Sequence, residues 1–180
     1  MSKPRKMLGS ADAPYILSLM RLIDTQSKAT IAAWALDYAE AHILPIYVKH
    51  FLANKPYNRL KNGPKNSIRI ARAVLDGHSY PKSDLHNCCN YSDRELGHSS
   101  IAQIAARTCG QACSSVYFPS HSLGLAFYGA AAIAYDRVGL DETPEVYDKI
   151  AAEECAKMEA ALRAVAVEDE PNPAKINWGC

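Results

Sequence analysis

The sequence predicts an all-α protein folded as a single compact bundle of about six to seven helices. Two long segments repeat apolar residues at steps of three and four, and no segment shows the alternation typical of strands. Roughly half of residues 101–135 are Gly, Ala, Ser, Thr or Cys, and small side chains let helices approach closely. We therefore predict a central pair of small-residue helices within one helical domain spanning residues 1–180.

The first helix is predicted from Pro14 to Ile23. A proline fits the first helical turn because its missing N–H would have no partner there, and Asp12 suits the positive end of the helix dipole. Residues 1–12 are predicted to form a flexible basic leader. No apolar segment follows its basic residues, so it does not resemble a secretory signal, and we expect a cytoplasmic protein.

A long amphipathic helix is predicted next, with a kink near Pro45, because a proline inside a helix removes a backbone hydrogen bond. Asp37, Glu40 and Lys49 fall off its apolar stripe and are expected to be solvated or paired. The stripe itself consists of Ile31, Trp34, Tyr38, Ala41, Pro45, Val48 and Leu52.

A shorter helix is predicted from Pro64 to near Asp76. Residues 54–64 before it are dense in turn-forming residues and predict a loop, and Gly77 provides a natural stop. The positions expected to face inward are Ile68, Ala71 and Leu75.

Residues 81–96 allow two interpretations. The segment is either one helix broken at Gly97, or Ser92 and Glu95 form a capping box that starts the central helix early. We favour the break.

The joint between the two central helices is predicted at Pro119, where proline can occupy a first turn. The apolar run from Leu123 to Tyr135 is shorter than the roughly 20 residues that a bilayer crossing requires. Burial within a soluble bundle is therefore favoured, and no membrane partner is expected.

The last helix is predicted to begin at Pro144, with Thr143 as its cap. Residues 168–180 contain two prolines and are predicted to form an irregular tail, from which Trp178 folds back onto the bundle. The core stripe of this helix is Tyr147, Ala151, Cys155, Met158, Leu162 and Val165. Its outer side alternates in charge at Glu145, Lys149, Glu153 and Lys157.

The six cysteines, at positions 88, 89, 109, 113, 155 and 180, include no Cys-x-x-Cys pair. Most lie in apolar, helical contexts. Reduced core cysteines are therefore preferred over a disulfide framework or a metal cage.

Two clusters could ligate a metal, but both are incomplete. Glu95 and His98 form a Glu-x-x-His step, which di-iron bundles require in two copies, and the sequence holds no second copy. His86 precedes Cys88 and Cys89, but adjacent cysteines point to different sides of a helix and chelate zinc poorly. No metal or cofactor is expected. The weak candidates for metal ligands are Glu95, His98, His86 and His121.

His121 is also a candidate catalytic base, because Ser120 and Ser122 flank it. A capping or hydrogen-bonded histidine is the simpler interpretation. No P-loop, Gly-x-Gly-x-x-Gly or Gly-x-Ser-x-Gly motif is present, and Gly124 and Gly129 are interpreted as close-packing positions. We therefore predict that the protein is not an enzyme.

Charge is distributed unevenly along the chain. Residues 41–75 contain seven basic residues and no acidic one, whereas in residues 136–170 eleven acidic residues accompany four basic ones. Lys65, Arg69 and Arg72 fall on one helical face and are the candidate partner-binding residues. Faces of opposite sign suit a protein partner, self-association or pairing within the bundle. The formal net charge of +1 and the shortness of the patch argue against nucleic acid.

Three segments resemble a known family: WALDYAEAHILPIY, SIRIARAVLDG and AARTCGQACSSVYFPSHSLGLAFYGAAAIAYD. They are similar to the Imm-five-like group of immunity proteins from bacterial polymorphic-toxin systems, and the resemblance extends from about Ile31 to Trp178. His121 matches a family histidine. Gln111 and Asn90 stand where the family usually carries histidine. The resemblance implies a compact helical protein that binds and neutralises a toxin without catalysis.

The leading hypothesis is a cytoplasmic bundle that occludes a cognate toxin domain through a charged surface. Reversing the charges of Lys65, Arg69 and Arg72 should then weaken toxin capture and leave thermal stability nearly unchanged. The alternatives are a helical-bundle enzyme with a metal or histidine site, and a homo-oligomeric structural protein.

Overall fold

The computed structural model describes residues 4–53, 62–87 and 99–179, and all regular structure within these ranges is helical. Helices α2 and α3 are joined by a π-helical turn and count here as one continuous helix, so the described residues form seven helices. The predicted all-α bundle of six to seven helices is confirmed. The elements are α1 (Pro14–Ile23), α2 (Lys28–Tyr38), α3 (Leu44–Ala53), α4 (Gly63–Leu75), α5 (Lys82–Asn87), α6 (Ser100–Ser114), α7 (Ala130–Val138) and α8 (Pro144–Val165).

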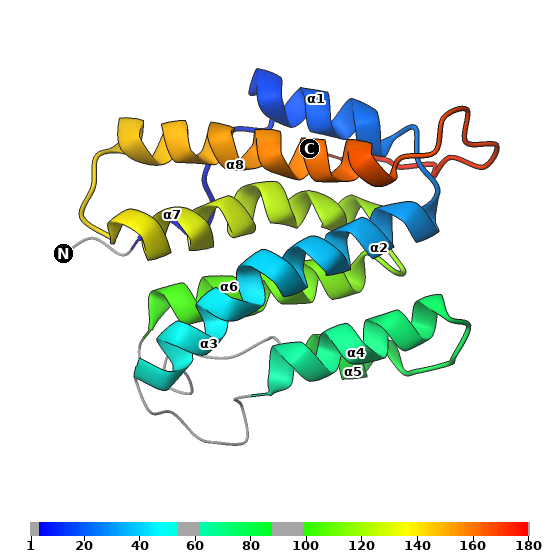
Figure 1. The fold of residues 1–180 in the computed structure, drawn as a ribbon, viewed down its shortest axis with the longest axis horizontal. Helices are drawn as coiled ribbons and strands as arrows, with labels where there is room; N and C mark the ends of the chain where they lie inside the picture. Colours follow the sequence, from blue (N-terminus) through cyan, green and yellow to red (C-terminus); the bar gives the residue numbers. More distant parts are fainter. Residues whose placement is uncertain (1–3, 54–61, 88–98, 180) are drawn as a thin grey trace.

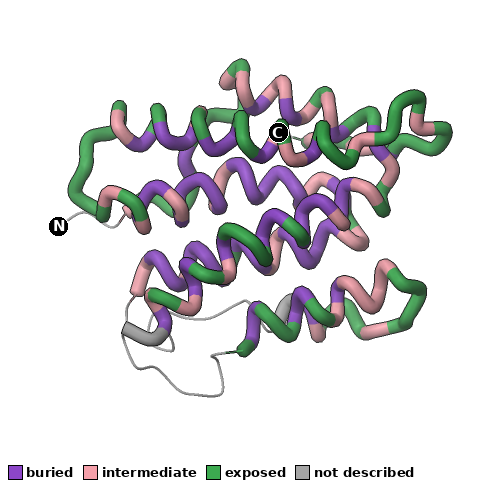
Figure 2. Tube along the Cα trace, viewed as in Figure 1, coloured by how far each residue is buried: buried purple, intermediate pink, exposed green. Residues whose placement is uncertain are grey.

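Helices α6 and α7 form the centre of the bundle (Figure 1). On one side of them α1 and α8 lie next to each other, on the other side lie α4 and α5, and α2–α3 runs diagonally across. Helix α6 contacts α3, α4 and α7 and is therefore the hub of the fold. Buried residues are concentrated along the central helices and on the inner faces of the outer ones (Figure 2).

Small side chains set the close spacing of the central pair, as predicted. Ala102, Ala105 and Cys109 on α6 are completely buried. A β-carbon on Gly129 would lie 3.2 Å from Cγ2 of Thr108, so this position has little room for a side chain. The prediction that the central glycines serve close packing is confirmed.

Helix α6 begins at Ser100. Ser99 has an extended backbone, and its side chain accepts a hydrogen bond from the N–H of Ala102 at 3.2 Å. The predicted break at Gly97 and the predicted Ser92–Glu95 capping box lie outside the described residues.

The second central helix starts irregularly. Pro119 opens a 3-10 turn, η3 (Pro119–Leu123), which is followed by a π-helical turn, η4 (Leu125–Gly129), before α7 begins. Pro119 occupies the first turn, where its missing N–H costs little. The predicted joint at Pro119 is confirmed.

A π-helical turn, η1 (Ala39–Ile43), lies just ahead of Pro45, where a kink was predicted. Within it the N–H of Leu44 bonds to the carbonyl of Ala39, five residues back. The wider turn shifts the register of the buried face. The apolar stripe was therefore predicted correctly up to Tyr38, but it was wrong at Ala41 and Pro45, which are exposed. The buried face continues instead through Ile43, Ile46, Tyr47 and Phe51.

Helix α8 follows the prediction except at its end. Thr143 occupies the N-cap position without a side-chain capping bond, and Pro144 is the first helical residue. Val165 was predicted in the core but is 50% exposed, because the helix ends there and none of the described elements covers its last turn. The other five positions of the predicted stripe are buried.

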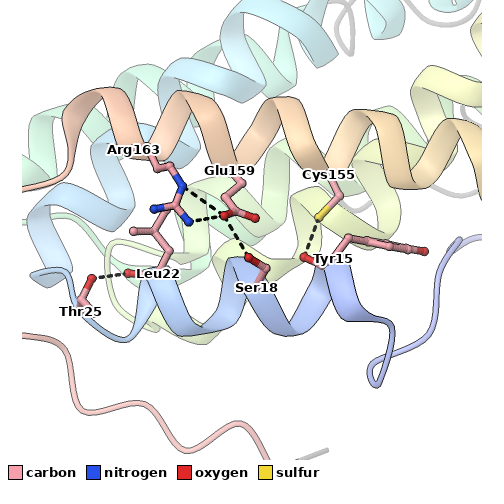
Figure 3. Close-up of polar contacts among 7 residues, drawn as sticks. All are labelled: Tyr15, Ser18, Leu22, Thr25, Cys155, Glu159 and Arg163. Carbon is pink, nitrogen blue, oxygen red and sulfur yellow. Dashed lines mark hydrogen bonds and ion pairs between the residues drawn. The ribbon is translucent and has the colours of Figure 1, made fainter.

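Polar contacts join α1 to α8 (Figure 3). The hydroxyl of Ser18 donates to Oε1 of Glu159 at 3.0 Å, and Nε of Arg163 donates to the same oxygen at 3.2 Å. One turn closer to the start of α8, the Cys155 thiol donates to the carbonyl of Tyr15 at 3.5 Å. These contacts fix the register of the two outer helices.

Both ends of the described chain contact the bundle. The Tyr135 hydroxyl donates to the carbonyl of Arg5 at 2.8 Å, and Leu8 is fully buried; the flexibility predicted for residues 1–12 stays a prediction. Residues 168–179 contain no helix. The indole Nε1 of Trp178 donates to the carboxylate of Asp24 at 3.0 Å, so the predicted return of Trp178 to the bundle is confirmed.

Cys109, Cys113 and Cys155 are buried thiols, as predicted for core cysteines. Burial raises the pKa of Cys155 to about 12, so its thiol is protonated and a poor nucleophile at neutral pH. Cys88, Cys89 and Cys180 lie outside the described residues. Among the helices that the structure describes, none has the length and apolar character needed to cross a bilayer.

Candidate partner-binding surfaces

The predicted basic face lies on α4, at the edge of the bundle. Ile68 and Ala71 of α4 are buried, and the helix packs against α6. Gly77 follows the helix with a φ of +89°, a conformation that stops a helix at little cost only when the residue is glycine. This packing turns the side chains of Lys65 and Arg69 to solvent.

Arg72, the third residue of the predicted face, is paired with carboxylates of a neighbouring helical segment. Its Nη2 lies 2.7 Å from Oδ1 of Asp37 and 2.7 Å from Oε2 of Glu40, both presented by the α2–η1 segment. Partial burial alone would lower the pKa of Arg72, but the bonds to Glu40 and Asp37 outweigh it and raise that pKa. Lys65 and Arg69 make no ion pair with the described residues, so they are the two cations of this face that are available to a partner.

Another ion-pair contact within the bundle involves a lysine from the basic segment 41–75. Lys49 Nζ and His50 Nε2 each lie 2.7 Å from Oδ1 of Asp136, which joins α3 to α7. Burial alone would raise the pKa of Asp136, but the hydrogen bonds from Lys49 and His50 lower it. The uneven charge along the chain therefore serves partly for pairing within the bundle, one of the alternatives that the sequence left open. Lys55, Arg59 and Lys61 lie outside the described residues.

Glu154 is a charged residue that sequence reasoning missed. It is only 4% exposed, and its Oε1 lies 2.6 Å from Arg137 Nη2 and 2.7 Å from Lys157 Nζ. Burial alone would raise the pKa of Glu154, but the hydrogen bonds from Lys157 and Arg137 lower it. The sequence did contain an indication of its burial, because Glu154 lies at the helical spacing expected for the same buried face as Tyr147 and Met158.

Replacing Glu154 with glutamine is expected to reduce the loss of stability in acid. In the unfolded chain the side chain of a glutamate has a pKa of about 4.3. Because the folded pKa is lower, the ion pairs stabilise the protein above that pH, and their contribution is lost as the pH falls through the folded pKa. Between about pH 6 and about pH 3, wild type should lose on the order of 1 kcal/mol more than the variant.

Urea unfolding followed by circular dichroism measures this difference. Glu153→Gln is the matched control, because Glu153 is exposed and lies 3.8 Å from the same arginine, Arg137. The control should keep the acid sensitivity of wild type. Equal sensitivity of wild type and Glu154→Gln would contradict the prediction.

Among the candidate metal ligands, only His121 has a described side chain. Glu95 and His98 lie outside the described residues, as does the side chain of His86 on α5. The ring of His121 lies 5.4 Å from that of Phe118, and Ser122 donates to the carbonyl of Pro119 at 2.7 Å, within its own turn. In the described residues no three His, Cys, Asp or Glu side chains are placed to hold a metal ion.

These features define a compact helical protein with a dense core and charged outer surfaces, a class suited to binding another protein. The family model for the Imm-5 like putative immunity protein matches residues 21–161, well over half of the chain. The chain belongs to this family. No curated protein and no solved structure matches the chain.

Proposed function

We propose that this protein is the immunity partner of a bacterial polymorphic toxin and neutralises its cognate toxin domain by occlusion, in the cytoplasm and without catalysis. The family match over residues 21–161 is the observation that supports the proposal most strongly. A dense small-residue core suits this role, because a rigid binder loses little conformational entropy when it docks.

The exposed basic face of α4, formed by Lys65 and Arg69, is the proposed contact with the toxin. Helix α4 packs on the hub helix α6, so the face is held on a fixed support. Two cations without an ion pair to the described residues would attract an acidic patch and orient the encounter. Arg72 supports the face from behind through Asp37 and Glu40 rather than contacting the toxin.

The double variant Lys65→Glu/Arg69→Glu is expected to weaken toxin binding by about tenfold or more, chiefly through slower association. Its unfolding midpoint should match wild type, because both side chains are exposed. Arg72 stays unchanged in this test, since its reversal would break two ion pairs. The earlier expectation that reversing all three charges leaves stability nearly unchanged therefore applies only to Lys65 and Arg69.

Surface plasmon resonance with a candidate toxin domain, taken from the gene next to that of this chain, measures the effect, and growth of toxin-expressing cells measures protection. Lys6→Glu/Lys149→Glu is the matched control, because it reverses two exposed lysines elsewhere and makes the same change in net charge. Equal binding by the two double variants would rule out the α4 face. No binding by wild type would reject the immunity function.

A further inference from the structure

A groove with a volume of about 680 Å³ opens where α1 ends, α8 ends and the C-terminal tail crosses between them. Its apolar lining includes Leu22, Val167 and Pro173. Val167 is 45% exposed, and Val165 beside it is 50% exposed. Single exposed valines are common on protein surfaces, but Val167 lines a concave site.

The rim of this groove is acidic. Arg163 is the one basic residue in its lining, and the Arg163 guanidinium is bonded to Glu159. Glu168 and Asp169 make no ion pair with the described residues, so their charges are not neutralised there. The carboxylates that line the groove are Asp24, Glu168, Asp169 and Glu170.

Gln26 holds one wall of the groove in place. Its side chain is 2% exposed, accepts from the N–H of Val167 at 2.7 Å and donates to the carbonyl of Val167 at 3.2 Å. Its own carbonyl accepts from the N–H of Ala174 at 2.8 Å. One buried residue therefore anchors both ends of segment 167–174, which carries three of the four carboxylates. A groove that is held in this way loses little conformational entropy when a ligand binds.

We infer that the groove binds a cationic segment of the cognate toxin, which rests on the proposed immunity function. Lysine and arginine are the side chains that fit, because their charged ends can reach the carboxylates while their aliphatic stems pack on Leu22 and Val167. Seven of the eleven lining residues follow residue 161, where the family match ends. The groove is therefore largely a feature of this chain beyond the matched region.

The segment that enters the groove is an extension of the toxin domain, such as a terminus or a long loop. The end of α8 and helix α4 lie on opposite sides of the central helices (Figure 1). A toxin domain that contacts Lys65 and Arg69 with its body would place a protruding segment in the groove on the other side. Such two-point attachment raises affinity through effective concentration.

A fluorescein-labelled peptide of about ten alternating arginines and leucines is the first probe. Its anisotropy should rise saturably with wild-type protein, and Glu168→Gln/Asp169→Asn should weaken binding by about tenfold. Asn suits position 169, where φ is +52°. The matched control Asp141→Asn/Glu142→Gln removes two exposed carboxylates at the other end of α8 and should bind as wild type.

Trp178 reports on the site directly, because its indole bonds to Asp24 in the groove lining. Peptide binding should change tryptophan emission in wild type but not in Trp178→Phe, where the buried Trp34 is the remaining tryptophan. No saturable binding by wild type, or equal weakening by the rim variant and its control, would overturn the inference.

The same candidate toxin domain is the second probe, and it separates the two proposals. Weaker toxin binding by Glu168→Gln/Asp169→Asn, with the control unchanged, would support the groove as a toxin contact. Toxin binding by this variant equal to wild type would overturn the groove and leave the immunity function standing. No toxin binding by wild type would overturn both.

Discussion

Replacing Trp34 with alanine is expected to lower the free energy of unfolding by about 3–5 kcal/mol. Trp34 is 2% exposed and packs in the core cluster shared by α1, α2 and α8, with Ile16, Met158 and Leu162. Its indole Nε1 also donates to the carbonyl of Met158 at 3.1 Å. The alanine variant leaves a large cavity and loses the indole hydrogen bond, and the loss is a large share of the roughly 5–15 kcal/mol that stabilises a typical domain.

Trp34→Phe separates these two effects. Phenylalanine retains most of the ring volume but cannot donate to Met158, so we expect a loss of about 1–3 kcal/mol. Trp178→Ala is the surface control and should cost less, because Trp178 is only partly buried at the tail. Urea unfolding followed by circular dichroism measures all three variants. Equal losses for Trp34→Ala and Trp178→Ala would contradict the role assigned to Trp34.

The amphipathic helices could be predicted because their burial follows a local period. The predicted stripe was correct at Ile31, Trp34 and Tyr38 of α2, and it was wrong only within and just after the π-helical turn. An extra residue in one turn changes the register of every later position, and an apolar repeat of three and four does not reveal it. Pro45 indicated an irregularity but not its kind. The prediction for Val165 was wrong for a different reason, because the exposure of this residue depends on which element covers the last turn of α8.

The charged surfaces were less predictable, because ion pairing depends on contacts distant in sequence. Arg72 lies 35 residues from Asp37, and Lys49 lies 87 residues from Asp136. Helical spacing correctly placed Arg72 on the same helix as Lys65 and Arg69, but it could not show that the α2–η1 segment supplies its carboxylates. The groove depends similarly on Gln26, whose partner Val167 lies 141 residues away. No local pattern indicates such a contact.

Replacing Gly124 with alanine is expected to destabilise the protein by about 2–3 kcal/mol, although the backbone there suits any residue. Its φ is −57°, so no conformational strain arises. The added β-carbon would instead lie 2.6 Å from Cβ and 2.7 Å from Cγ of Gln111. Cβ of Gln111 is fixed to the α6 backbone and cannot rotate away, so α6 and η3 must move apart. Gly129→Ala should cost less, since its nearest contact is 3.2 Å.

Second substitutions at Gln111 test whether this contact is the cause. Gln111→Ala keeps the offending Cβ and should relieve little of the loss, whereas Gln111→Gly removes both carbons that the new methyl group meets. Although Gln111→Gly alone costs about 1 kcal/mol in helix propensity, it should recover at least about 1 kcal/mol in the Gly124→Ala background. A double-mutant cycle from urea unfolding gives this coupling. Strict additivity of Gly124→Ala and Gln111→Gly would show that the spacing of α6 and η3 is set elsewhere.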